Sequence, residues 1–366
     1  MINACLEGRE TIAMRAMMMR GGTSKGIYLL KSDLDETGVD PDVLLPAMMG
    51  SPDHRQIDGV GGGSSTTSKV AIVSLSTRPG CDIDFLFAQV DVTSIRVDRG
   101  PTCGNMLTGV GPFAIERGLV APTDGRTVIR VHLVNTGANV EVSVNTPGGQ
   151  LTYQGDWEIS GVPGTAAPID VVFRDFCGGS TGTLFPTGNS IDDIGGVMIT
   201  AIDAGVCAII ADAASFGIAG DEAPQHLSSN RGLMERIESV RLRAAVAMGL
   251  GDVTGRVLPK VILIAKSHRG DVQSRYFVPT SCHPTHAVGG AICLATAATF
   301  DDTVVGKSLG RPFTDGRIVI EHPAGTMDVE VTDHGADRGL SAAVRSTARK
   351  LFDGLVFTGM SQRSAA

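Results

Sequence analysis

The chain is poor in aromatic residues, which make up 4% of its 366 positions, and it has no apolar run of about 18 residues. Without such a run no transmembrane helix is expected, and the charges at Glu7, Arg9 and Glu10 are unlike a secretory signal. Because aromatic side chains are few and glycines number 47, the core must be built from aliphatic residues and methionine. We therefore expect a cytoplasmic protein that does not bind membranes.

Metal-type cysteine spacing is also missing. The seven cysteines include no Cys-x-x-Cys pair, so we expect reduced thiols and not a disulfide framework. Cys282, His283 and His286 carry metal-ligand chemistry but lack a second ligand pair, and we predict neither a metal nor another cofactor. The formal net charge of −8 disfavours nucleic acid as a partner. An anionic ligand must then meet local positive charge, for which the candidates are helix N-termini and the residues Arg20, Lys25, Arg55, Lys69 and Arg275.

The chain does contain many short strand-like stretches, and its hydrophobic content of 42% suffices for two domains. Most stretches are separated by turn residues, which favours largely antiparallel sheets. Two glycine- and alanine-rich helical segments, residues 104–117 and 284–299, each follow a cluster that contains a cysteine. This pattern predicts an α+β fold of two similar halves that face one another. A further helix, residues 233–248, has ordinary core-facing amphipathicity. The strand predictions are residues 27–30, 70–75, 83–92, 127–135, 139–144, 197–202, 206–211, 257–265, 274–278, 317–321, 326–331 and 354–358.

The segment Pro101-Thr102-Cys103-Gly104-Asn105-Met106 places a thiol at the start of the first of these helices. Pro101 is not expected inside a helix, whereas threonine or cysteine can cap one. Amide N–H groups at a helix N-terminus attract anions, and the same field lowers the pKa of a cysteine. The segment therefore predicts a carboxylate-binding group and an acid/base group in one place.

Lys69 follows the polar, glycine-rich run 58–68 and precedes the apolar residues Val70-Ala71-Ile72-Val73. A lysine that leaves a loop for a buried strand loses solvent, and its pKa then falls from about 10.4 toward the range of a general base. The alternative is a surface lysine at the start of a strand, because lysines are seldom buried.

Several longer motifs occur in a single order along nearly the whole chain. They include Met19-Arg20-Gly21-Gly22-Thr23-Ser24-Lys25-Gly26, Gln56-Ile57-Asp58-Gly59, Thr67-Ser68-Lys69-Val70, Cys103-Gly104-Asn105 and Phe185-Pro186-Thr187-Gly188-Asn189. In these motifs and their order the chain resembles the PrpF family, which contains 2-methylaconitate isomerase, methylitaconate isomerase and 4-oxalomesaconate tautomerase. The segments 51–58 and 109–120 and the motif Thr146-Pro147-Gly148-Gly149 are similar to the oxalomesaconate branch of gallate and protocatechuate degradation.

The resemblance implies a diaminopimelate epimerase-like fold with two pseudo-symmetric domains. In this fold a curved, mostly antiparallel sheet wraps around a central helix in each domain, and the active site lies between the domains. We expect one domain at residues 1–188 and the other at 189–353, with residues 354–366 returning to the first. A homodimer is expected.

The resemblance also implies a cofactor-independent isomerase that shifts a proton in an unsaturated tricarboxylic acid. The implied substrate is 4-oxalomesaconate, with 2-methylaconitate, aconitate and methylitaconate as alternatives. Lys69 falls on the family's catalytic lysine, and Cys103 is its partner, as an acid/base or as a group that positions the substrate. Contacts to the carboxylates of a di- or tricarboxylate are expected from Gly21, Gly22, Thr23, Ser24, Ser64, Ser65, Thr66, Ser68, Gly104, Asn105, Met106, Asn189, Arg275 and His283.

Functions of other classes remain open at this stage. A non-catalytic accessory protein that binds a tricarboxylate would use the same residues. A cysteine hydrolase is a third possibility, but no Cys-His-Asn set can be identified in the sequence. A nucleotide-binding loop is disfavoured, because neither glycine-rich run has glycine directly before its lysine or Ser/Thr directly after it.

Overall fold

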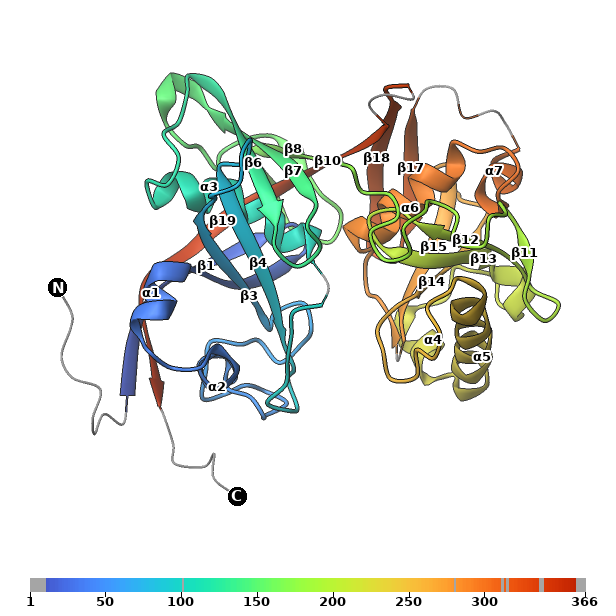
Figure 1. Cartoon of the computed structure of the whole chain (residues 1–366), viewed down its shortest axis with the longest axis horizontal. Coiled ribbons are helices and arrows are strands. Elements are labelled where there is room, and N and C mark those ends of the chain that lie inside the picture. Colours follow the sequence, from blue (N-terminus) through green and yellow to red (C-terminus); the bar gives the residue numbers. More distant parts are fainter. Residues whose placement is uncertain are drawn as a thin grey trace.

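The computed structural model describes residues 11–100, 102–279, 281–310, 313, 316–335 and 339–359. The early charges at residues 7–10 and the end of the predicted returning segment, 360–366, lie outside the described residues. Figure 1 shows two sheet-rich halves, with the red strand β19 (Leu340–Gly359) running between them. None of the described helices is long and apolar enough to cross a membrane.

The first half is a closed ring of strands around one helix, α3 (Gly104–Glu116). Each strand pairs with the next in the order β1, β2, β3, β4, β6, β7, β10, β19, and β19 returns to β1. The strands are β1 (Thr11–Gly21), β2 (Ser24–Leu30), β3 (Lys69–Leu75), β4 (Ile83–Val90), β6 (Gly125–Leu133), β7 (Asn139–Thr146) and β10 (Pro168–Arg174). Smaller elements are α1 (Lys31–Glu36), α2 (Pro41–Met49), β5 (Val97–Asp98), a 3₁₀ turn (Pro147–Gly149), β8 (Trp157–Glu158) and β9 (Thr165–Ala166).

The second half is an open sheet that packs on α6 (Val288–Ala298). Its strands pair in the order β11, β12, β13, β14, β15, β17, β18, β19. They are β11 (Asp192–Asp193), β12 (Met198–Asp203), β13 (Cys207–Asp212), β14 (Lys260–Ala265), β15 (Val272–Val278), β17 (Arg317–His322) and β18 (Gly325–Asp333), and β16 (Ser281–Cys282) pairs with the end of β15. The other elements are a 3₁₀ turn (Ala213–Phe216), α4 (Pro224–Ser229), α5 (Arg231–Ala247) and α7 (Val304–Leu309).

The two halves repeat one topology. In the first, β2 and β3 are parallel, β3 and β4 antiparallel, and β4 and β6 parallel. In the second, β13 and β14 are parallel, β14 and β15 antiparallel, and β15 and β17 parallel. The central helix follows β5 in one half and β16 in the other. The predicted α+β fold with two pseudo-symmetric halves, each mostly antiparallel around a central helix, is therefore confirmed.

The central helices are apolar all round because strands surround them. Small residues let the strands approach closely: a Cβ on Gly109 would lie 2.4 Å from Tyr28 Oη, and one on Gly290 would lie 2.3 Å from Tyr276 Cε2. Strand β14 packs toward α6 through Ile262 and toward α5 through Leu263. Its uninterrupted apolar sequence follows from this burial on both faces.

Strand β19 connects the halves through its pairing. Residues 340–344 pair with β18, residues 341–347 with β10, and residues 348–359 with β1. The chain thus returns to the first half within residues 341–347. The domain limits at residues 1–188 and 189–353, with 354–366 returning, stay a prediction.

Candidate functional site

Lys69 is the first residue of β3, and it lies in a row of side chains that crosses three strands. Lys69 pairs with Gln89 on β4, which in turn pairs with Asp98 on β5. The Lys69 Nζ donates to Gln89 Oε1 at 2.7 Å and lies 5.0 Å from the centroid of the Phe87 ring. The Gln89 amide nitrogen donates to the carbonyls of Ser65 and Ser68, which fixes its oxygen toward the amine. The lysine is therefore held at a defined place and not free at the surface.

The N-terminus of α3 lies against the turn between β1 and β2. Cys103 is extended at the N-cap, and no side chain caps the helix. The first N–H groups of a helix have no partner within it, so those of residues 104–106 are donors for a ligand. Thr23 and Asn105 hold the turn: the Asn105 amide donates to Thr23 Oγ1 at 3.1 Å, and Asn105 Oδ1 accepts from the Thr23 N–H at 3.4 Å.

His283 contributes from the second half. Its Nδ1 accepts from the Thr285 N–H at 3.1 Å, so the neutral ring carries its proton on Nε2. Burial, and next the positive charge of Lys69, lower the pKa of His283 to about 4. The imidazole is neutral near pH 7 and offers an N–H donor, and Lys69 acts on it from the other half of the chain.

Two contacts between the halves bring these groups together. A Cβ on Gly104, at the start of α3, would lie 2.6 Å from the Cβ of Val288, the first residue of α6. The hydroxyls of Thr23 and Thr285 lie 3.5 Å apart. The N-termini of the two central helices therefore meet at the boundary, and Cys103, Thr23, Asn105 and His283 lie close to it.

A second lysine at the start of a strand, Lys260, was missed in the sequence. It is the first residue of β14, it is 9% exposed, and no described residue forms a hydrogen bond or ion pair with its amine. Burial lowers its pKa to about 8, against the raising effect of Asp98, and Arg241 and Lys69 lower it further. A sequence repeat could have identified it: Lys69 and Lys260 each precede four aliphatic residues, Val-Ala-Ile-Val and Val-Ile-Leu-Ile.

Other predicted contacts in the first half serve the loops and the core. Ser68 is fully buried, and its hydroxyl accepts from the Gln56 amide at 2.7 Å. The Thr66 carbonyl accepts from the Lys25 N–H, which ties the serine-rich loop to β2, while Ser64 and Ser65 are exposed. The Met106 side chain is fully buried in the core. Gly21 ends β1, Gly22 has a φ of 51°, and Ser24 is buried at the start of β2.

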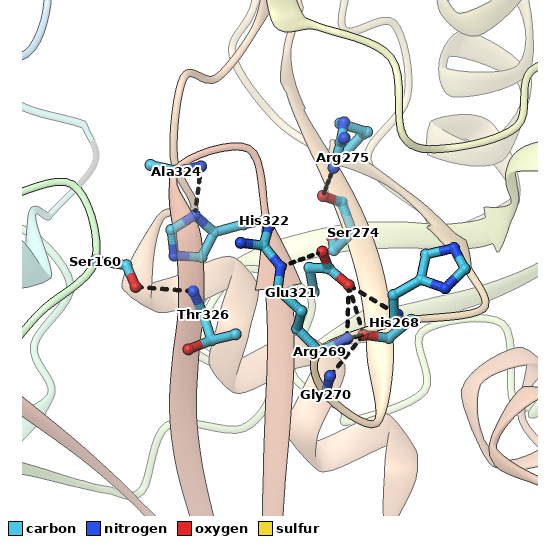
Figure 2. Close-up of polar contacts among 11 residues, drawn as sticks. Ser160, His268, Arg269, Gly270, Ser274, Arg275, Glu321, His322, Ala324 and Thr326 are labelled. Atoms are coloured by element: carbon cyan, nitrogen blue, oxygen red, sulfur yellow. Dashed lines mark hydrogen bonds and ion pairs between the residues drawn. The ribbon is translucent and has the colours of Figure 1, made fainter.

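Arg275 and Asn189 lie apart from these residues. Arg275 adjoins Tyr276 on β15, so its side chain points to the opposite face of the sheet from Tyr276 and His283. Arg275 donates to the carbonyls of Glu222 and Ser274. Figure 2 shows the contact with Ser274 and, beside it, the buried carboxylate of Glu321, which accepts from Arg269 and from backbone N–H groups of the neighbouring loop. Asn189 is exposed and lines a cavity of about 480 Å³ with Phe185, Phe300 and Lys307. Neither residue lies beside Lys69.

Two buried histidines, His286 and His322, and the half-buried His283 predict acid sensitivity. Burial lowers the pKa values of His283 and His322 to about 4 and that of His286 to about 3. From pH 6.5 down to about 4 the unfolded chain therefore binds protons that the folded protein does not. As the pH is lowered through this window, the free energy of unfolding should decrease by about 1.4 kcal/mol per pH unit for each histidine. Urea unfolding at about pH 7 and about pH 5.5 measures this, and equal stability at both would contradict it.

Taken together, these groups can bind an anion of several carboxylates and move protons. The described residues contain no group of three or more His, Cys, Asp or Glu placed to hold a metal ion. Positive charge comes from two amines, and neutral donors come from His283 and the start of α3.

Comparison with known proteins gives consistent results. The family model described as "PrpF protein" matches residues 11–359. The 4-oxalomesaconate tautomerase of Pseudomonas putida is 46% identical over 94% of this chain and 95% of its own length. The (4E)-oxalomesaconate Delta-isomerase of Novosphingobium sp. (strain KA1) is 46% identical over 93% of this chain and 96% of its own.

Solved structures agree on the architecture. A methylitaconate-delta-isomerase superposes with a TM-score of 0.81 at 30% identity, covering 98% of this chain and all of its own. A hydroxyproline epimerase from Agrobacterium vitis superposes with a TM-score of 0.53 at 12% identity, covering 96% of this chain and 94% of its own. The second likeness shows only the fold, which is of the epimerase type.

Proposed function

The chain belongs to the PrpF family, and we propose that it is an isomerase that shifts a proton within an unsaturated tricarboxylic acid, with 4-oxalomesaconate as its substrate. The 46% identity to a 4-oxalomesaconate tautomerase over nearly the full length of both chains carries this proposal. The arrangement around Lys69 supports it, because an amine, a neutral imidazole and a helix N-terminus suit proton transfer on a polyanion.

In the proposed mechanism the amine of Lys69 removes a proton from a carbon made acidic by a neighbouring carbonyl group or double bond. The C–H electron pair forms a new double bond, and the electrons of the old one accept a proton at the far end, so no atom or electron is gained or lost. Gln89 holds the amine in place. The N–H groups at the start of α3 and the His283 Nε2–H donate to the oxygens where negative charge gathers.

Cys103 is proposed as the partner of Lys69, as an acid/base or as a group that positions the substrate. Its place at the N-cap of α3 supports this, because the thiol adjoins the first-turn N–H donors. The turn at residues 21–24 is proposed to hold one carboxylate, since Asn105 and Thr23 fix it against the same helix. A homodimer in the cytoplasm is proposed as the working state.

A methylitaconate-type substrate is the second candidate, favoured by the TM-score of 0.81 to methylitaconate-delta-isomerase. The proton shift would be the same, and only the groups around the reacting carbons would differ. A binding protein without catalysis is the remaining alternative.

Proton NMR in deuterated buffer tests the function. The purified protein should convert 4-oxalomesaconate quickly and place solvent deuterium in the product, because the removed proton exchanges on the enzyme. Conversion of 2-methylaconitate or methylitaconate alone would keep the reaction and change the substrate. Neither conversion nor exchange with any of the three acids would contradict the proposal.

A further inference from the structure

The internal repeat gives Lys69 a counterpart in the second half. Lys69 begins β3, the strand parallel to β2 and antiparallel to β4. Lys260 begins β14, the strand parallel to β13 and antiparallel to β15. The two lysines therefore occupy equivalent positions, one in each half.

The register also shows which way Lys260 points. Side chains alternate along a strand, so Lys260 shares a face of the sheet with Ile262, which pairs with Tyr276. The Tyr276 carbonyl accepts from the His283 N–H, and the two rings lie 6.0 Å apart in an edge-on contact. Lys260 is thus on the His283 face of the second half, the face whose groups interact with Lys69.

The loop before Lys260 is held in place, and no described acidic group pairs with the amine. The preceding loop is fixed by Arg241, which donates to the carbonyls of Val253 and Leu258 at 3.2 and 2.9 Å and pairs with Glu238. A groove of about 410 Å³ lies between that loop and residues 96–98 of the first half. Asp98 lines the groove and is the acidic group that acts on Lys260, but no ion pair between the two is found among the described residues.

An ammonium group on a largely buried side chain is costly when it has no partner, because it keeps only part of its hydration and gains no counter-charge. In a chain of net charge −8 such a group needs a reason to persist. The charged groups that act on it are Asp98, Arg241 and Lys69, and Lys260 in turn acts on His283. Of these four only Asp98 is acidic, and it does not pair with the amine, so the site has room for the negative charge of a ligand.

We propose that Lys260 binds a carboxylate of the substrate from the side opposite Lys69, and so selects for an acid with a carboxylate remote from the reacting carbons. This inference rests on the proposed function. The two half-sites then have separate tasks: the amine in the first half transfers the proton, and the amine in the second half holds the anion.

Lys260→Met tests the proposal by its KM, with Lys266→Met as the matched control. Lys266 is exposed and directly follows the other end of β14, so its replacement removes the same charge from a residue next to the same strand. The KM for the tricarboxylate should rise about 10- to 100-fold in Lys260→Met, the range for a lost charge-assisted hydrogen bond, and stay unchanged in Lys266→Met. Lys260→Arg, which keeps the charge, should lie between Lys260→Met and the unmutated protein.

A stability measurement separates this role from a structural one. Because the ammonium group of this largely buried side chain has no partner in the described part of the chain, Lys260→Met should melt no lower than the unmutated protein. The saturated tricarboxylate tricarballylate should raise the melting temperature of the unmutated protein more than that of Lys260→Met. An unchanged KM in Lys260→Met, whatever its kcat, or equal stabilisation of both proteins by tricarballylate, would overturn the proposal. Absence of turnover in the unmutated protein would instead refute the proposed function.

Discussion

Replacing Lys69 by methionine should lower kcat/KM for the proton shift by about 10²- to 10⁴-fold, the usual contribution of a positioned acid/base group. Methionine keeps an unbranched apolar stem next to the Phe87 ring but has no amine for Gln89 to hold. The loss should fall mainly on kcat, because the carboxylate contacts proposed for α3 and Lys260 remain. Steady-state kinetics and deuterium incorporation measure it, and both should decline together.

Lys31→Met is the control for this variant. Lys31 begins α1 and forms an exposed ion pair with Asp35. Its replacement by methionine therefore removes the same charge from the same half of the molecule. Its kinetics should match those of the unmutated protein. If Lys69→Met retained more than about a tenth of the activity, or exchanged deuterium at the normal rate, another base would have to be sought.

The predictable parts of this fold are those where one local pattern decides the structure. The helix predicted at residues 104–117 is α3 (Gly104–Glu116), since its small and apolar residues suit a helix buried on all sides. The helix predicted at 284–299 begins later, at Val288, because the preceding residues turn around His283 Nδ1. The sequence predicts only residues 354–358 of strand β19. The rest of the strand forms because it pairs with both halves, which no local pattern of apolar and polar residues indicates.

The candidate site divides in the same way. Lys69 and Cys103 stand at the start of a strand and of a helix, where loop meets buried element, so local sequence marks them. Arg275 was expected beside them, but its neighbour Tyr276 takes the facing side of β15 and the strand's alternation turns Arg275 away. Local sequence does not mark Lys260 as a site residue, because a lysine at the start of an apolar strand indicates no function by itself. The internal repeat does mark it, since Lys260 is the equivalent of Lys69 in the other half.

Gly104→Ala should disturb the place where the halves meet. Alanine favours a helix over glycine by up to about 1 kcal/mol, so this change would stabilise α3 if there were room. There is none: the new Cβ would lie 2.6 Å from the Val288 Cβ and 2.9 Å from its Cγ1. We expect the free energy of unfolding to fall by about 1 to 3 kcal/mol. Activity should fall about 10²-fold, since the donors of α3 move relative to His283.

A double variant decides whether that contact is the cause. Val288→Gly removes the atoms that the new Cβ would meet, so Gly104→Ala with Val288→Gly should be more active than Gly104→Ala alone, despite the second glycine. Gly232→Ala, on the exposed side of α5 with its nearest neighbour 3.8 Å away, should stabilise the protein and leave activity unchanged. If Gly104→Ala behaved like Gly232→Ala, or if Val288→Gly restored nothing, the start of α3 would not depend on the second half. Recovery in the double variant would mean that the helix from one half is held in register by the helix from the other, as a site divided between two half-sites requires.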